Sequence, residues 1–201
     1  MYIKNRKKNT SYRLIVVLKS TDIKHLEKFK SALEYNGKII KKEINDKRGF
    51  TTEKAELRIN SKALCKDLIK FGVIPQKTGK EIIPSNIPDY LIKDFVRGFF
   101  DGDGSITKSN TKNFYRFKLG SASEKILQQI KDWFSKNGIE GVPYYLENQY
   151  RIPFFILESN CRSKCNQIYH LLYDDANIYL DRKYERVLDM FRYCALEQRC
   201  S

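Results

Sequence analysis

Residues 91–106, LIKDFVRGFFDGDGSI, decide how this chain folds. Apolar side chains recur here at helical spacing, and a run of acids and glycines follows them. Gly98 lies inside the apolar segment and has no Cβ, so a second helix can approach it almost backbone to backbone. Gly102 and Gly104 then allow the chain to turn sharply. The stretch is therefore predicted to form a helix that packs closely against another helix and ends in an acidic turn.

The two acids of this turn, Asp101 and Asp103, stand at the C-terminal end of the predicted helix. A carboxylate is electrostatically disfavoured there, so the pattern indicates a cation or a partner that compensates for it. A plain glycine-rich turn or a calcium loop is the alternative interpretation. An EF-hand needs oxygen ligands at alternate positions and a closing Glu about a dozen residues along. Ser105 is instead followed by Ile, Thr and Lys, and no Glu closes the loop.

The run VRGFFDGDG at residues 96–104 resembles the signature of the LAGLIDADG homing endonucleases at Gly98, Asp101, Asp103 and Gly104. The resemblance implies an α+β fold of two αββαββα repeats that form a DNA-binding saddle. In such proteins the sheets lie along the major groove and the signature helices pack together at the centre. The implied function is sequence-specific, divalent-metal-dependent cleavage of double-stranded DNA, as expected of a mobile intron or intein gene.

The resemblance assigns roles to individual residues of the signature. In the family the acid before the last glycine is the metal ligand, which assigns Mg²⁺ or another divalent cation to Asp103. Asp101 is assigned mainly to helix termination and packing, with metal ligation as a second role. The helix contact and the turn are assigned to Gly98, Phe99, Gly102 and Gly104.

Lysines complete the implied active site, because a basic residue near the metal stabilises charge on the phosphate or polarises water. The resemblance puts the active-site lysine at Lys183, with Lys77 as its counterpart in the first half of the chain. Lys118, on the strand after the signature, corresponds to a water-contacting position in relatives. A plain phosphate contact or a surface position is the alternative for each of the three lysines.

The same order of predicted elements occurs twice along the chain, as expected of a duplicated fold. Thr21 and Ser123 each follow a strand-like segment and open an amphipathic helix. Each half continues with a pair of strand-like segments and a further helix start. We assign residues 1–87 to the first repeat and residues 88–201 to the second.

Only the second repeat has a recognisable signature. The offset of 102 residues between Thr21 and Ser123 carries the first signature helix to a point ahead of residue 1. Three hypotheses account for this: the reading frame is truncated or mis-started, the chain pairs with a second copy through the helix at residues 91–100, or it is a decayed relative that no longer cuts.

The charge of the chain indicates a nucleic-acid partner. Lys and Arg number 38 against 24 Asp and Glu, which gives a formal net charge of +14 and an attractive field for phosphate. With 41% hydrophobic residues the chain can still bury a core. Polar and basic residues of the predicted strands are the candidates for contact with DNA: Lys4, Arg6, Arg13, Lys41, Arg58, Lys108, Lys112, Arg116, Tyr145 and Arg151.

Cysteine usage and hydropathy exclude other classes of protein. Cys161, Cys165 and His170 can be drawn as a metal site, but a closed zinc site needs four ligands and no matching pair exists, so no zinc is expected. No apolar run approaches the roughly 18 residues of a membrane span, and the N-terminus lacks the apolar segment of a signal peptide. We expect no membrane partner and an intracellular protein, cytoplasmic or organellar.

Two classes of function therefore stay open. One is the metal-dependent endonuclease, which needs a second motif helix from a partner chain or from a missing N-terminus. The other is a cleavage-deficient relative that binds DNA or RNA, such as a transcription regulator or an intron maturase. Asp103 and the glycines favour the enzyme, and the missing first signature favours the binding protein or a dimer.

Overall fold

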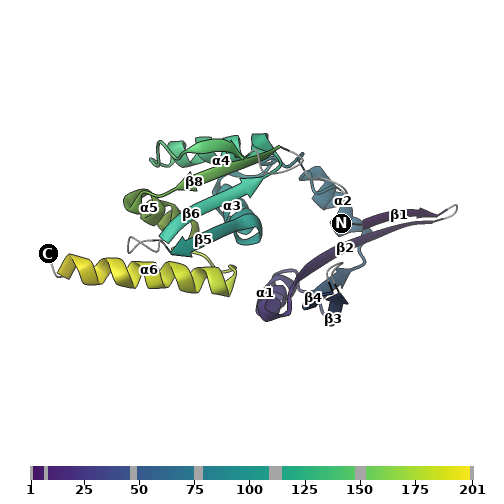
Figure 1. Cartoon of the computed structure of the whole chain (residues 1–201). Coiled ribbons are helices and arrows are strands. Elements are labelled where there is room, and N and C mark those ends of the chain that lie inside the picture. Colours follow the sequence, from purple (N-terminus) through teal and green to yellow (C-terminus); the bar gives the residue numbers. More distant parts are fainter. Residues whose placement is uncertain are drawn as a thin grey trace. The chain divides into compact units, whose positions relative to one another are not determined.

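The chain consists of two compact units, Met1–Lys77 and Thr78–Ser201 (Figure 1). The computed structural model describes residues 2–6, 9–45, 49–74, 79–108, 115–147 and 153–199. Both units combine helices with one four-stranded antiparallel sheet, which confirms the predicted α+β class. No helix within these ranges is both long and apolar enough to cross a bilayer.

The first unit has the element order ββαββα. Its strands are β1 (Tyr2–Arg6), β2 (Asn9–Lys19), β3 (Ile39–Asn45) and β4 (Thr51–Ile59), and its helices are the 3-10 turn η1 (Ser20–Asp22), α1 (Ile23–Ala32) and α2 (Lys62–Lys70). The strands pair in the order β1-β2-β4-β3. In the described part of the chain this unit begins with β1, at Tyr2.

The second unit has the order αββαββα, followed by one more helix. It comprises α3 (Asp89–Asp103), β5 (Gly104–Lys108), β6 (Tyr115–Ser121), α4 (Glu124–Lys136), β7 (Tyr144–Glu147), β8 (Phe154–Ser159), α5 (Arg162–Tyr173) and α6 (Asp181–Arg199). Its strand order, β5-β6-β8-β7, repeats that of the first sheet and confirms the predicted duplication. The signature forms α3 and leads directly into β5.

Each sheet has an inner face that packs against helices and an opposite, outer face. In β2 the side chains of Leu14 and Val16 contribute to a core with Leu26 of α1 and Cys65 of α2. The side chains between them along the strand lie on the outer face, because successive residues of a strand point to opposite sides. This alternation determines which predicted residues are available to a partner.

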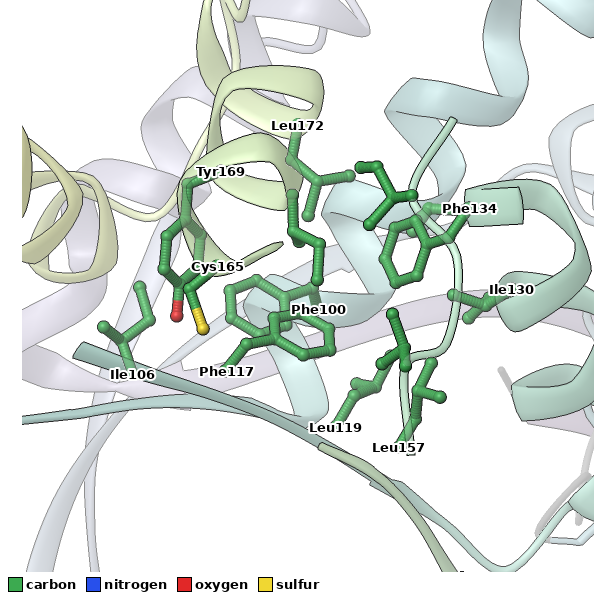
Figure 2. Packing of buried hydrophobic residues seen from close by; sticks show 14 of the residues in the cluster. Phe100, Ile106, Phe117, Leu119, Ile130, Phe134, Leu157, Cys165, Tyr169 and Leu172 are labelled. Carbon is green, nitrogen blue, oxygen red and sulfur yellow. The ribbon is translucent and has the colours of Figure 1, made fainter. Parts of the chain in front are cut away.

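Aromatic packing in the second unit fixes the position of α3. The Phe100 ring of α3 stacks on the Phe117 ring of β6 with 4.9 Å between centroids, and Phe134 of α4 meets Phe117 edge-on at 5.8 Å. Figure 2 shows these rings together with Tyr169 of α5 in one buried cluster. The end of the signature helix is therefore anchored on the inner face of its sheet.

Candidate active site

The two acids of the signature lie in different environments at the end of α3. Asp101 is buried, and its carboxylate accepts hydrogen bonds from the Tyr173 hydroxyl (2.6 Å) and the Leu180 backbone N–H (2.9 Å). Burial and the carboxylate of Asp101 raise the pKa of Tyr173 far above its ordinary value, so the hydroxyl remains a donor at neutral pH. Asp103 is the last residue of α3 and is exposed. One acid is thus buried in the fold, and the other is exposed.

A buried ammonium group compensates for the negative end of α3. Lys183 of α6 is 3% exposed, and its Nζ donates to the carbonyl oxygen of Phe100 and to that of Gly104 (2.6 Å). The same Nζ lies 4.8 Å from the centroid of the Phe100 ring. A cation at a helix C-terminus is favourable because the last carbonyl groups carry partial negative charge. Lys183 therefore binds the backbone on both sides of Asp103, and its assignment as the active-site lysine stays a prediction.

A second buried cation, Arg97, connects α3 to the chain around α5. Its guanidinium donates to the carbonyl oxygens of Ile178 (2.9 Å) and Leu172 (3.0 Å) and pairs with the carboxylate of Asp94. Sequence reasoning did not assign a role to Arg97 beyond its place in the signature. An arginine inside an apolar helix was the available signal, but its partners are backbone groups about eighty residues away along the chain.

The glycines of the signature lie in different environments, and Gly102 does not form the predicted turn, because it lies inside α3, which passes directly into β5 at Gly104. A Cβ added at Gly98 or Gly102 would meet no atom within 4 Å, so this side of α3 is open within its own unit. A Cβ added at Gly104 would collide with the Phe100 ring, so glycine is required at the junction of α3 and β5, which we call the signature turn. Phe99 is partly buried and packs against the core of the second unit.

Polar side chains on the outer face of the second sheet form a connected group near the signature turn. Lys118 lies opposite Ser105 in the β5–β6 register, and its Nζ is 4.0 Å from the Glu147 carboxylate. Glu158 of β8 lies 3.4 Å from Arg116 Nε and accepts a hydrogen bond from the Tyr145 hydroxyl. Burial, and then Glu158, raise the pKa of Tyr145 to about 12. The predicted residues Arg116, Lys118 and Tyr145 are thereby brought together on one face.

The outer face of the first sheet has a similar carboxylate-centred group. Glu56 of β4 pairs with Lys42 Nζ (2.9 Å) and with the guanidinium of Arg58, and these hydrogen bonds, Arg58 first, lower its pKa. Arg13 shares this face and donates to Asn60 Oδ1 (2.7 Å). The predicted DNA contact Lys41 lies on the opposite, inner face, because it pairs with Ala55 of the core.

The remaining predicted residues lie at edges or beyond the described residues. The predicted DNA contact Lys108 is exposed at the end of β5, but it points to the inner side of the sheet, as the core residue Ile106 two positions earlier does. Lys4 and Arg6 lie on β1, where Lys4 pairs with Ser11, but their side chains are outside the described part of the chain. Lys77, Lys112 and Arg151 are outside the described residues altogether.

The carboxylate of Asp103 at the end of α3 suits a hard divalent cation such as Mg²⁺. Magnesium keeps several waters and is usually bound by one or two carboxylates together with substrate phosphates, so one exposed acid is a sufficient protein contribution. No cluster of three or more His, Cys, Asp or Glu side chains occurs within the described ranges. Asp103 would therefore hold the ion with water and phosphate oxygens, or with a second carboxylate from another chain.

Comparison with known proteins agrees with the signature. Residues 91–173, from α3 to the end of α5, match the family model of a LAGLIDADG-like domain. This match confirms the resemblance identified from the residues of the turn. No curated protein sequence matches the chain.

Solved structures of homing endonucleases share the fold. Mesophilic variants of I-DmoI match with a TM-score of 0.53 and 16% identity over 87% of this chain and 88% of theirs. I-DmoI in complex with DNA and Ca matches with a TM-score of 0.54 and 17% identity over 89% and 83%. I-WcaI bound to its DNA recognition sequence matches with a TM-score of 0.60 and 15% identity over 92% of this chain and 79% of that one. The fold is that of the LAGLIDADG homing endonucleases.

Proposed function

We propose that this chain is a homing-type endonuclease that cleaves double-stranded DNA at a specific sequence with the help of Mg²⁺ or a similar cation. The observation that carries the proposal is the separation of the two signature acids, with Asp101 buried and Asp103 exposed. A protein that only binds DNA gains nothing from a carboxylate at this edge, because the charge repels phosphate. The family match and the DNA-bound structures with the same fold support the proposal.

In the proposed reaction Asp103 holds the cation against the scissile phosphate. When bound, such a cation stabilises charge on the phosphate and lowers the pKa of a bound water. Lys118, beside the signature turn, is proposed to orient the attacking water or to bind the phosphate. Lys183 keeps the backbone on both sides of Asp103 in place and is proposed as a positioning residue. Lys77 is proposed as its counterpart in the first repeat.

Cleavage of both strands requires a second acid, and we propose that a second copy of the chain supplies it. The sequence contains one signature, so one chain contributes one Asp103. The open side of α3 at Gly98 and Gly102 has space for a closely packed helix. A homodimer through residues 91–100 would bring two copies of Asp103 to one DNA duplex.

The test is to challenge a library of long duplexes with the wild type and with Asp103→Asn, in Mg²⁺ and in Ca²⁺. Asp103→Asn keeps the shape of the side chain and removes its charge, so DNA binding should persist while cleavage in Mg²⁺ is lost. Asp132→Asn is the matched control, because Asp132 is also an exposed helical acid of the second unit.

The possible outcomes separate the two classes of function. Equal cleavage by the wild type and Asp103→Asn would exclude Asp103 as the metal ligand. Binding without cleavage by a wild-type dimer on every target would favour a DNA-binding protein such as a transcription regulator. Tighter binding of structured intron RNA than of duplex DNA would favour a maturase.

A further inference from the structure

The outer faces of the two sheets can be compared position by position. Arg58 of β4 and Glu158 of β8 each stand three residues before the N-cap of the following helix, so they are equivalent. Arg58 pairs with Ile15, and Glu158 pairs with Lys118. Ile15 of the first sheet is therefore equivalent to Lys118 of the second.

The same register relates two further pairs of outer-face residues. Val17 pairs with Glu56 and Gly120 pairs with Ile156, which makes Val17 equivalent to Gly120. On the neighbouring strand of each sheet, Ile40 pairs with Glu56 and Tyr145 pairs with Ile156, so Ile40 is equivalent to Tyr145. The first sheet thus has three aliphatic side chains where the second has Lys118, Gly120 and Tyr145.

We call Ile15, Val17, Ile40 and Ile44 the aliphatic patch. Three of them, Val17, Ile40 and Ile44, are 41–43% exposed, and they share this face with Glu56 and Lys42, which lie between them. Strand alternation puts cationic residues on the same face and around the patch: Arg13, Lys19, Lys42, Lys54 and Arg58.

This combination matches one surface of duplex DNA. The major groove presents the C5-methyl group of thymine between two rows of phosphates, and apolar side chains discriminate thymine by contact with that methyl group. A second copy of the chain would bring like charges against the patch, because the chain carries a net charge of +14. The Glu56 carboxylate between Val17 and Ile40 also disfavours insertion of the patch into lipid.

We infer that the first sheet selects A·T base pairs in one half of the DNA stretch bound by each chain, by contacting thymine methyl groups with the aliphatic patch. The inference rests on the proposed DNA-binding function and extends it to the chemistry of the target. At the equivalent positions the second sheet has Lys118 and Tyr145, which can form hydrogen bonds, and Gly120, so it selects by a different chemistry. The stretch of DNA bound by one chain is therefore asymmetric, with thymine concentrated in the half bound by its first unit.

The experiment uses two pools of random duplexes, one synthesised with thymine and the other with uracil, which lacks the methyl group. Duplexes retained by the full chain in Ca²⁺ are sequenced, and the affinity of each recovered site is measured in both forms. The wild type should recover sites with A·T pairs concentrated in one half from the thymine pool only. Its affinity for the uracil form should fall about fourfold for each methyl group contacted.

Variants identify the responsible sheet. Val17→Ser combined with Ile40→Ser should bring the thymine-to-uracil affinity ratio close to one. Ile69→Ser, at an exposed aliphatic residue of α2, is the control and should keep the wild-type ratio. Tyr145→Ser should change the selected bases in the other half while the ratio persists.

The outcomes distinguish this inference from the proposed function. Equal affinity of the wild type for thymine and uracil forms, with salt-dependent binding of both, would overturn the inference and leave DNA binding intact. A chain that binds neither pool would overturn the proposed function itself. The comparison of thymine and uracil duplexes uses the wild type alone. It therefore tests the inference even if the double variant fails to fold.

Discussion

The end of α3 depends on the ammonium group of Lys183, which is buried against two carbonyl oxygens. Lys183→Met should lower the free energy of unfolding by about 2 kcal/mol, because buried carbonyls lose a charged donor. It should also weaken Ca²⁺ binding to the DNA complex, since the turn that carries Asp103 loosens. Calorimetric melting and calcium titration of the complex measure the two effects.

The comparison for Lys183 is Lys136→Met, at an exposed lysine near the end of α4, which should change neither quantity. If Lys183→Met has a lower melting temperature but unchanged calcium affinity, Lys183 stabilises the fold and does not position Asp103. A wild-type melting temperature would contradict the buried contacts themselves.

Glu56 gives the first unit a dependence on acidic pH. Arg58 and Lys42 lower the pKa of its carboxyl group, so Glu56 contributes stability that is fully present above the unfolded pKa of about 4.3 and is lost as the pH falls through the folded value. Glu56→Gln should therefore cost about 1 kcal/mol at pH 7 and less near pH 3. Denaturant unfolding at both pH values, with exposed Glu53→Gln as the control, measures this difference. The same cost at both pH values would show that the ion pairs contribute no net stability.

The roles of individual site residues could be predicted only where the signature itself defines them. The motif assigns the acid before the last glycine to the metal, and this role of the exposed Asp103 stays a prediction. The partners of Asp101 could not be predicted, because Tyr173 and Leu180 come from a different part of the chain. Lys41 illustrates another limit: a shift of one residue along a strand moves a side chain to the opposite face.

At the scale of helix α3, the open side at Gly98 predicts how a larger side chain there affects assembly. Gly98→Leu should leave the isolated chain as stable as the wild type or up to about 1 kcal/mol more stable, because the added side chain meets no atom of its own unit and leucine favours helix. A closely packed helix pair should be disrupted, since overpacking costs about 1–3 kcal/mol. Sedimentation and melting temperature measure assembly and stability separately.

Gly104→Ala is the contrasting substitution in the same signature. Its Cβ would collide with the Phe100 ring, so this variant should lose stability without any effect specific to assembly. A Gly98→Leu chain that assembles like the wild type would contradict the packing role of α3. Together the two glycines separate helix contact from turn formation.

The order of the elements was predictable because strand and helix periodicities recur in both halves of the chain. The second unit extends beyond this pattern, since α6 follows the predicted repeat and carries Lys183 to the end of α3. Its position depends on Arg97, Asp101 and Lys183, whose buried polar contacts join segments distant in sequence. Local periodicity carries no information about such contacts. The sequence pattern therefore predicts the helix α6 but not where it packs.

Considered as a whole, the molecule combines two sheets of one topology with different outer faces. Duplication preserves strand order because the core residues of each unit need the same backbone. The outer faces are not constrained in this way, which allows Ile15 in one sheet and Lys118 in the other. An asymmetric pair of surfaces suits a target whose two halves differ in sequence.

The net charge of +14 predicts duplex DNA binding that weakens steeply with salt. Each phosphate neutralised releases counterions, so the logarithm of the affinity should fall linearly with that of the salt concentration, with a slope of about −0.9 per phosphate contact. Arg13→Gln, on the outer face of the first sheet, should reduce the slope by about one and weaken binding to all sequences alike. Lys66→Gln, at an exposed residue of α2, should leave it unchanged. Affinity that stays constant between about 50 and 200 mM salt would contradict DNA binding through these faces, since even six phosphate contacts predict a loss of about a thousandfold.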